Sequence, residues 1–306
     1  MGRRRKAAPP FSFGAVLLLQ EGQSPASGLC INSPVRLDSF RDNMSKNART
    51  SPSRRPPQGR IELIPVTGLP EIREGDDLAR IIVAAARRAK IGFQNRDILV
   101  VAQKIISKAE GRIARLSTFE PSAQALQLAA RGSRDPRLVE VILRESRRII
   151  REHPVLIVET HHGFVCANAG VDHSNVPGED VVTLLPTDPD LSARRLGKAL
   201  RRLSKKQIAV VISDTFGRPW RLGLTNVAVG AAGVPVMLDL RGTRDRNAKR
   251  LQATILAIAD DLAAAAGLAM GKQEGVPVVI VRGYKYRPAQ VPATKIIRPA
   301  HEDLFR

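Results

Sequence analysis

The sequence predicts a mixed α/β protein, an α/β or α+β arrangement in which helices pack on sheets. From residue 60 onward, short apolar runs alternate with amphipathic stretches whose apolar residues recur every three or four positions. Hydrophobic residues make up 43% of the 306 residues and charged residues 25%, which is typical of a globular protein with a sizeable core. Because aromatic residues are only 4% of the chain, we expect that core to consist mainly of Val, Ile, Leu and Ala.

Helices are predicted where an amphipathic stretch begins with a helix-starting signal. Residues 75–90 carry acidic side chains in the expected first turn, where the helix dipole favours them. Two further stretches have a proline near their start, a position that tolerates the missing N–H group. The predicted helices are, in order, residues 75–90, 121–132, 135–150, 190–203 and an Ala-rich helix at about 247–270.

Strands are predicted for apolar runs that are too short for a buried helix. Residues 154–160 and 164–170 flank the sequence His-His-Gly, which predicts a hairpin with a glycine in its turn. The predicted strands are, in order, residues 60–66, 97–103, 154–160, 164–170, 207–214, 224–233, 234–240 and 276–283.

Residues 1–59 differ in composition from the rest and predict a leader outside the folded domain. A basic start precedes the apolar run FSFGAVLLL, which imitates a secretion signal, but the following ASGLC is a poor cleavage site. We therefore expect a disordered or mis-started leader, with Met44 as the alternative start. The folded domain is then expected at residues 60–287, and residues 288–306 are expected to form a loose C-terminal tail.

The net charge of +20 allows an anionic partner such as a nucleic acid or a phosphorylated ligand. Residues 1–60 hold 11 Lys and Arg against 3 Asp and Glu, and the rest of the chain contains no long basic block interleaved with aromatic residues. A nucleic-acid-binding protein is therefore the weaker of the alternatives that the charge leaves open.

Cysteines and apolar runs restrict the class of protein further. Cys30 and Cys166 form no Cys-x-x-Cys motif, which argues against a disulfide scaffold and indicates a reducing, cytoplasmic compartment. No uncharged apolar run reaches about 18 residues, so we expect no membrane span. The P-loop, GxGxxG, HExxH and GxSxG motifs are absent from the expected contexts, so a bound nucleotide would need another cradle.

Four polar clusters interrupt the apolar framework near strand ends. Residues 66–77 predict either a plain turn with a capped helix or a turn whose backbone N–H groups face a ligand. Residues 102–112 present Lys104 and Lys108 beyond a strand. Their ammonium groups suit phosphate oxygens, and a solvated surface is an equally good interpretation.

The third cluster, residues 167–175, contains Asp172 and Asn175. Their oxygens either ligate a cation or only satisfy the backbone of their own loop. In the fourth cluster, Asp214 and Thr215 end a predicted buried strand, where α/β proteins gather ligands.

Asp214 and Thr215 together can hold an ion like Mg²⁺ against phosphates, although Asp214 could simply cap the next segment. Arg218 and Arg221 follow and can neutralise charge on a transferring phosphoryl group. Together the clusters predict a metal–phosphate site.

Five ordered motifs resemble the coenzyme F420-0:L-glutamate ligase family: GLPEIREGDDL, ISKAEGR, NAGVDHSNV, SDTFGRPWRLG and MGKQEGVPVVIVRG. They span about residues 60–286. Some members of the family carry a C-terminal reductase-like domain, and we expect the stand-alone form here. The resemblance implies the glutamyl ligase fold, an intertwined homodimer and a catalytic domain at residues 60–287.

The activity that this resemblance implies is a GTP-dependent ligation of L-glutamate to coenzyme F420-0. The first glutamate joins the lactyl carboxylate and later ones are γ-linked. The γ-phosphate of GTP activates the carboxylate as an acyl phosphate, and the amine displaces phosphate, so that GDP and phosphate are released. The implied cofactors are two divalent cations, Mg²⁺ or Mn²⁺, and a monovalent cation such as K⁺.

Site residues are carried over motif by motif. Asp172 and Asp214 resemble ligands of one metal, and Thr215 with Gln273 resembles the ligand set of the second. The residues with an implied catalytic role are Asp214, Arg218, Arg221 and Lys108. The implied nucleotide contacts are Leu69, Pro70, Glu71, Ile72, Gln103, Lys104, Lys108, Asn175, Met270, Gly271, Lys272, Gln273, Glu274 and Gly275.

One position departs from the family pattern. The residue after the Met-Gly pair is commonly a Glu or Gln that helps hold the second metal, whereas here it is Lys272. A protonated lysine cannot ligate a cation. Either Gln273 or Glu274 takes that role, or the ammonium group stands in for the charge of the ion. A different carboxylate-bearing acceptor on the same fold is a further alternative.

Overall fold

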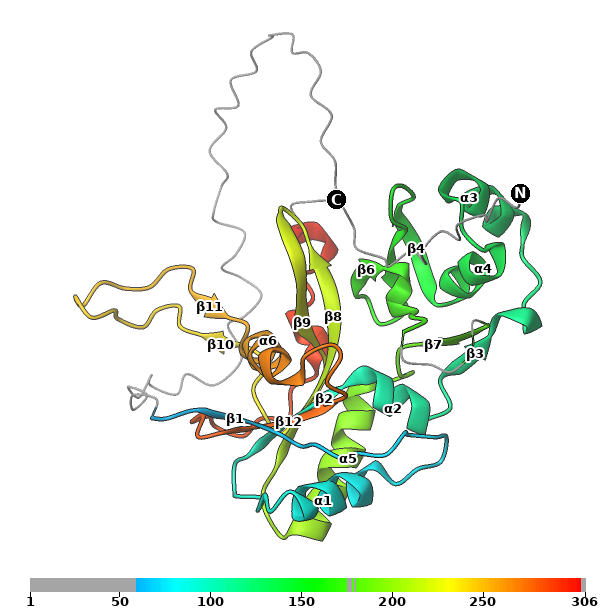
Figure 1. Ribbon diagram of the computed structural model, residues 1–306. Coiled ribbons are helices and arrows are strands. Elements are labelled where there is room, and N and C mark those ends of the chain that lie inside the picture. The colour runs from blue at the N-terminus through cyan, green and yellow to red at the C-terminus, as the bar shows by residue number, and fades with distance from the viewer. Residues whose placement is uncertain (1–58, 175–177, 179, 304–306) are drawn as a thin grey trace, which may run out of the picture. The chain divides into compact units, whose positions relative to one another are not determined.

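A central five-stranded sheet organises the computed structural model, which describes residues 59–174, 178 and 180–303 (Figure 1). The predicted leader, residues 1–59, lies almost wholly outside the described residues. The strand order is β1-β12-β2-β8-β9, and helices cover both faces, which confirms the mixed α/β class. The strands of this sheet are β1 (Glu62–Pro65), β2 (Ile98–Ala102), β8 (Ala209–Arg218), β9 (Arg221–Ala232) and β12 (Val278–Arg282).

Only one pair of neighbouring strands in this sheet is parallel. β2 runs parallel to β8, with Ile98 opposite Ala209 and Ala102 opposite Ser213. β12 pairs antiparallel with β1 and with β2, and β9 returns antiparallel to β8 as a long hairpin. The carboxyl ends of β2 and β8 therefore lie side by side at one edge.

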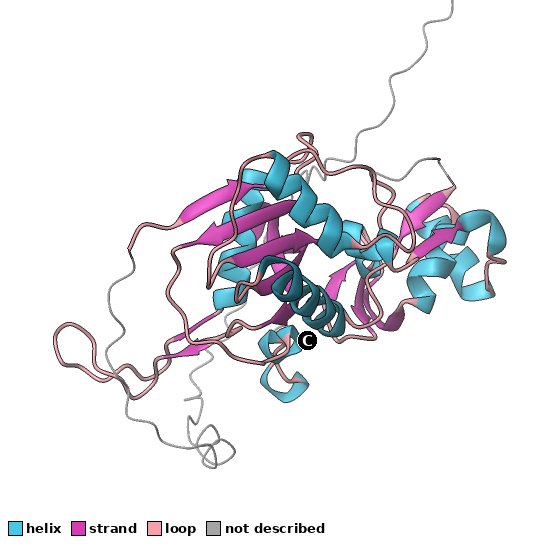
Figure 2. Ribbon diagram, turned by 90° about the horizontal axis from the view of Figure 1, so that it is seen from below, coloured by secondary structure: helices cyan, strands magenta, loops and turns pink. Residues whose placement is uncertain are grey.

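The two faces of the sheet use alternate residues of each strand, as a period of two requires. Leu99 and Val101 face α1 (Leu78–Arg88) and α5 (Pro189–Ser204), whereas Ile98 and Val100 face α6 (Ile258–Met270). Figure 2 shows helices on both sides of the strands. Each fully buried Leu, Ile or Val contributes roughly 1.5–3 kcal/mol by leaving water.

Aspartate side chains cap two helix starts, and in α1 the acidic residues expected in the first turn precede the helix. Asp77 caps α1 by accepting the N–H of Arg80 at 3.1 Å, and Asp188 caps α5 by accepting the N–H of Leu191 at 2.8 Å. Asp190, in the first turn of α5, is buried and accepts the N–H groups of Ala231 and Ala293, both at 2.8 Å. The segment expected to be a loose tail is thus held at Ala293, which is fully buried.

A second group of elements has its own hydrophobic cluster, centred on Val139, Ile142, Leu156 and Val158. Two helices and two small sheets build it, and its three-stranded sheet contains the predicted hairpin at residues 154–170. These elements are β3 (Ile113–Arg115), α3 (Ala123–Gly132), α4 (Pro136–Arg144), β4 (Ser146–Arg151), β5 (Ile157–Thr160), β6 (Val165–Ala167) and β7 (Val181–Thr183). The short helix α2 (Gln103–Ala109) leads into the group from β2.

Two predicted helices are wrong in extent. The helix expected at residues 135–150 ends at Arg144, and β4 follows, because β4 pairs with β5 and its Arg148 bonds Glu159 at 2.7 Å. The helix expected at 247–270 begins only at Ile258.

Before α6, the carboxylate of Asp245 accepts the N–H groups of Asn247 at 2.9 Å and of Lys249 at 2.8 Å. Those bonds form a turn that competes with a helix. The short strands β10 (Leu238–Asp239) and β11 (Ile255–Leu256) occupy part of the remaining sequence. Among the described residues, no helix is both long and apolar enough to cross a membrane.

We expect Gly230→Ala to destabilise the protein by about 2–3 kcal/mol. An added Cβ at Gly230 would lie 2.4 Å from the carbonyl oxygen of Pro189, in the capped first turn of α5. Urea denaturation measures the change in the free energy of unfolding. Gly217→Ala, in the same hairpin but with nothing within 4 Å of its added Cβ, is the control and should change stability by less than about 0.5 kcal/mol. Equal stability of the two variants would contradict this packing.

Candidate functional site

The sheet brings three of the four polar clusters to one edge. Because Ala102 pairs with Ser213 in parallel register, the residues that follow Ala102, Gln103 and Lys104, lie at the level of Asp214, which follows Ser213. The backbone N–H of Ala102 also donates to Pro277 at 2.8 Å, which places the loop before β12 at the same edge. The N–H of Val66 donates to Val278 at 2.9 Å, so the turn after β1 starts there as well.

The prediction that the strand ends at Asp214 is wrong. β8 continues to Arg218 because Asp214 pairs with Val227 on β9, and Thr215 pairs with Asn226. The change from apolar to polar residues marks the point at which β8 leaves the core and becomes half-buried, not the end of the strand.

Asp172, from the third cluster, reaches this edge through an ion pair. Its Oδ2 lies 2.7 Å from Nζ of Lys104, and its Oδ1 accepts the backbone N–H of Ser174 at 2.7 Å. The hydroxyl of Ser174 also contacts both side chains. Burial acts to raise the pKa of Asp172, but the hydrogen bonds from Lys104 and Ser174 outweigh it, so the pKa lies below the ordinary value.

Asp214 is the more strongly perturbed carboxylate. Burial raises its pKa to about 6, the N–H of Thr215 opposes that rise, and the negative charge of Asp172 adds to it. The ammonium groups of Lys104 and Lys272 act in the opposite direction. Two carboxylates and two ammonium groups therefore share one electrostatic environment.

Thr215 and Lys272 contact each other directly. Nζ of Lys272 donates to Oγ1 of Thr215 at 2.7 Å, and that hydroxyl donates to Oδ1 of Asn226 at 3.0 Å. The amide of Asn226 in turn lies 3.7 Å from the sulfur of Met270, the last residue of α6. Burial lowers the pKa of Lys272, Lys104 lowers it further, and Asp214 and Asp172 oppose the change.

The loop after α6 is organised by the carboxylate of Glu274. Its Oε2 accepts the N–H of Gln273 at 3.0 Å, and the backbone N–H groups of the loop lower its pKa. A Cβ on Gly271, whose φ is +60°, would lie 1.7 Å from that oxygen, so only glycine fits there. Gly275, with φ of +65°, completes the turn, and Gln273 is exposed.

Lys108 and Gln103 lie on α2. Lys108 is buried, and its Nζ lies 2.5 Å from Oε1 of Glu71, an exposed residue of the turn after β1. Gln103 is almost fully buried and accepts the hydroxyl of Ser107 at 2.7 Å, while its Nε2 has no hydrogen-bond partner among the described residues.

The other predicted contacts of that turn divide between core and surface. Ile72 is part of the core and Leu69 packs against it, whereas Pro70 is exposed. The predicted residue Asn175 lies outside the described residues.

Arg218 and Arg221 are not brought to the Asp172–Asp214 pair within this chain. They face each other at the tip of the β8–β9 hairpin, and Arg218 donates to the carbonyl oxygen of Leu222 at 2.8 Å. Figure 1 shows this hairpin extending beyond the rest of its sheet.

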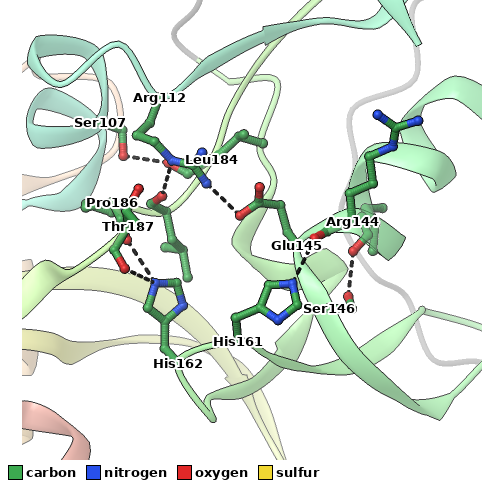
Figure 3. A network of polar contacts seen from close by, with 12 residues as sticks. Ser107, Arg112, Arg144, Glu145, Ser146, His161, His162, Leu184, Pro186 and Thr187 are labelled. Carbon is green, nitrogen blue, oxygen red and sulfur yellow. Dashed lines mark hydrogen bonds and ion pairs between the residues drawn. The ribbon is translucent and has the colours of Figure 1, made fainter.

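A separate network of polar contacts includes Arg112, Glu145, His161 and His162 (Figure 3). Arg112 donates to Leu185 at 2.9 Å and pairs with Glu145 at 2.6 Å, which links the end of α2 to the end of α4. Nε2 of His161 and of His162 each lies 2.9 Å from a backbone carbonyl oxygen. These histidines, to which the sequence assigned no role, hold loops in place.

Two residues that were not among the predicted site residues, Ser174 and Asn226, contact predicted ones. Asn226 carries a signal, because it interrupts the otherwise apolar run of β9 and lies directly across from Thr215. Ser174 stands within the third cluster, where only Asp172 and Asn175 were singled out.

A divalent cation fits the carboxylate pair. Asp172 and Asp214 offer hard oxygen ligands, and a positive ion between them would offset both the burial that raises the pKa of Asp214 and the smaller contribution of the charge on Asp172. Within the part of the chain that the structure describes, no three His, Cys, Asp or Glu side chains are grouped to hold a metal. Thr215 does not fit a second cation, since the ammonium group of Lys272 already donates to its oxygen.

The fold and the charged edge are typical of an α/β enzyme, with a candidate site at the carboxyl ends of the two parallel strands β2 and β8. Comparison with known proteins specifies which enzyme. The family model described as F420-0:Gamma-glutamyl ligase matches residues 68–283. The chain belongs to this family of ligases.

Curated relatives match over most of their length. The Coenzyme F420:L-glutamate ligase of Methanothermobacter thermautotrophicus is 46% identical over 250 residues, covering 80% of this chain and 99% of the relative. The protein of the same name from Methanopyrus kandleri is 46% identical over 82% of this chain and 98% of its own. The Coenzyme F420:L-glutamate ligase of Archaeoglobus fulgidus is 42% identical, covering 81% of this chain and 97% of the relative.

Proposed function

We propose that this protein joins L-glutamate to coenzyme F420-0, with GTP as the co-substrate. The relatives named Coenzyme F420:L-glutamate ligase support the acceptor and the amino acid. The observation that carries the proposal is the pairing of two carboxylates, Asp172 and Asp214, with the ammonium groups of Lys104 and Lys272 at one sheet edge. Such a set suits a triphosphate that arrives with a metal ion.

The proposed chemistry has two displacements. A carboxylate oxygen of the acceptor attacks the γ-phosphorus of GTP, the bond to the β–γ bridging oxygen breaks, and GDP leaves. The amine nitrogen of glutamate then attacks the acyl carbon of the acyl phosphate, inorganic phosphate leaves, and the nitrogen loses a proton. γ-Linked additions would repeat the sequence on the new carboxylate.

The residues of this chain would bind and orient the reactants. Asp172 and Asp214 would hold one Mg²⁺ or Mn²⁺, which supplies positive charge to the phosphates and polarises their oxygens. Lys108, kept at the site by Glu71, would bind a phosphate oxygen, and Lys104 would exchange Asp172 for phosphate. The side-chain N–H of Gln103, which has no partner among the described residues, would become a donor to the nucleotide if α2 moved to expose it.

A product assay tests this function. The full chain is incubated with F420-0, glutamate, GTP and Mg²⁺ or Mn²⁺, and the mass of the coenzyme is followed. We expect stepwise additions of one glutamyl residue that require GTP, and the number of steps gives the length of the tail. GTP binding without addition of glutamate would favour a different carboxylate acceptor. Failure to bind GTP would contradict the proposal and favour the alternative that the net charge of +20 suggests, a nucleic-acid-binding protein.

Lys108→Met should lower kcat/KM for this reaction by about 10²–10³-fold, because the ammonium group that would stabilise negative charge on the transferring phosphoryl group is lost. The thermal unfolding temperature checks that the fold is kept. Lys198→Met, on the exposed side of α5, is the matched control and should leave kcat/KM unchanged. Full activity of the Lys108 variant would exclude the phosphate role.

We also propose that the protein is a homodimer in which a second copy covers the tip of the β8–β9 hairpin. Leu222 and Leu224 expose 83% and 66% of their surface there, beside Arg218 and Arg221. Contact of those arginines with an anionic substrate would then involve the second copy.

The double variant Leu222→Ser, Leu224→Ser should shift the mass in light scattering from dimer towards monomer, because the apolar surface that a partner would bury is removed. Leu268→Ser, which changes a leucine that is 84% exposed on α6, is the control and should leave the mass unchanged. A wild-type chain that is monomeric at all concentrations would rule out the dimer.

A further inference from the structure

The contact between Lys272 and Thr215 has a consequence for the number of metal ions. The oxygen of Thr215 is engaged on both sides, since it accepts from Nζ of Lys272 at 2.7 Å and donates its proton to Asn226 at 3.0 Å. A divalent cation on the same oxygen would lie against a positive ammonium group. The oxygen of Thr215 is therefore already in contact with a cation, the ammonium group of Lys272.

We infer that the ammonium group of Lys272 takes the place of a second divalent cation, so that the site holds one divalent cation and one built-in positive charge. This inference rests on the proposed function in one respect, namely that the ligand at the site carries phosphate groups. The divalent cation would lie between Asp172 and Asp214, and Lys272 would meet the phosphates from the side of Thr215.

The carboxylate next to Lys272 in the sequence is engaged by its own loop. The carboxylate of Glu274 is turned back onto its own loop, where it accepts the N–H of Gln273 at 3.0 Å and lies over Gly271. Freeing it would break its contacts with the backbone N–H groups of a turn built on two positive-φ glycines. Gln273 contributes its backbone N–H to that turn.

The position of Lys272 is set by elements on both sides. Asn226 is fixed on β9 across from Thr215, and its amide contacts the sulfur of Met270 at 3.7 Å. Gly267 on α6 lets Asn226 come close, because an added Cβ there would lie 3.1 Å from the side-chain amide. The end of α6 thus holds both Asn226 and the loop that carries Lys272.

The charges around the site agree with this count of ions. Lys104 pairs with Asp172, and Asp172 and Asp214 are the carboxylates whose charges reach Lys272. One divalent cation between the two carboxylates neutralises them and releases Lys104 for the ligand. Among the described residues, a second divalent cation would find no further carboxylate of those whose charges reach Lys272, and the ammonium group would repel it.

The test counts Mn²⁺ bound to the full chain by electron paramagnetic resonance, with and without a non-hydrolysable GTP analogue, and measures binding of the analogue separately by calorimetry. We expect one Mn²⁺ per wild-type chain and two per chain of Lys272→Gln, in which an amide oxygen replaces the ammonium group. Lys198→Gln is the matched control and should bind one, and thermal unfolding confirms that each variant is folded.

Each outcome decides the inference. Two Mn²⁺ in the wild type, none in the wild type, or one in the Lys272→Gln variant would overturn it. If the analogue binds while the wild type holds two ions, the nucleotide part of the proposed function stands and only this inference fails. If the analogue does not bind but the counts are one and two, the ammonium inference stands and the GTP-dependent function fails.

Discussion

The parallel pairing of β2 with β8 is the constraint on which the site depends. Its register sets Ala102 opposite Ser213, so the next residues of both strands, Gln103 and Asp214, begin at the same level of the sheet. β2 then turns directly into α2, while β8 continues as the first strand of the hairpin. A shift of this register by one residue would exchange the two faces of the strand and change the position of Lys104 relative to Asp214.

The elements that the sequence predicted well are those whose pattern has a single physical cause. β2, β12 and α1 have uninterrupted apolar runs or a strict helical period, and the structure contains each of them. The end of α4 and the start of α6 could not be predicted, because both depend on partners distant in sequence or on a single side chain, Asp245. Likewise, the change from apolar to polar residues at Asp214 indicates where β8 becomes half-buried, but it does not indicate where the pairing of β8 with β9 ends.

Part of the site could be predicted because metal and phosphate ligands belong to few residue types. Asp172, Lys104 and Asp214 stood out by chemistry, and the structure places their charges together. The link between Lys272, Thr215 and Asn226 could not be predicted, since it requires α6, β8 and β9 to be placed in space. The positions of Arg218 and Arg221 were hidden for the same reason, because the hairpin carries them outward.

Asp190 has a consequence for the order in which the molecule becomes complete. Its buried carboxylate accepts one N–H from β9 and a second from Ala293, which follows it by 103 residues. During synthesis, α5 emerges before both of these donors. Domains fold as units once their contacts are available. The bond between α5 and β9 can form once residue 231 is available, whereas the bond to the C-terminal segment cannot form until residue 293 has left the ribosome.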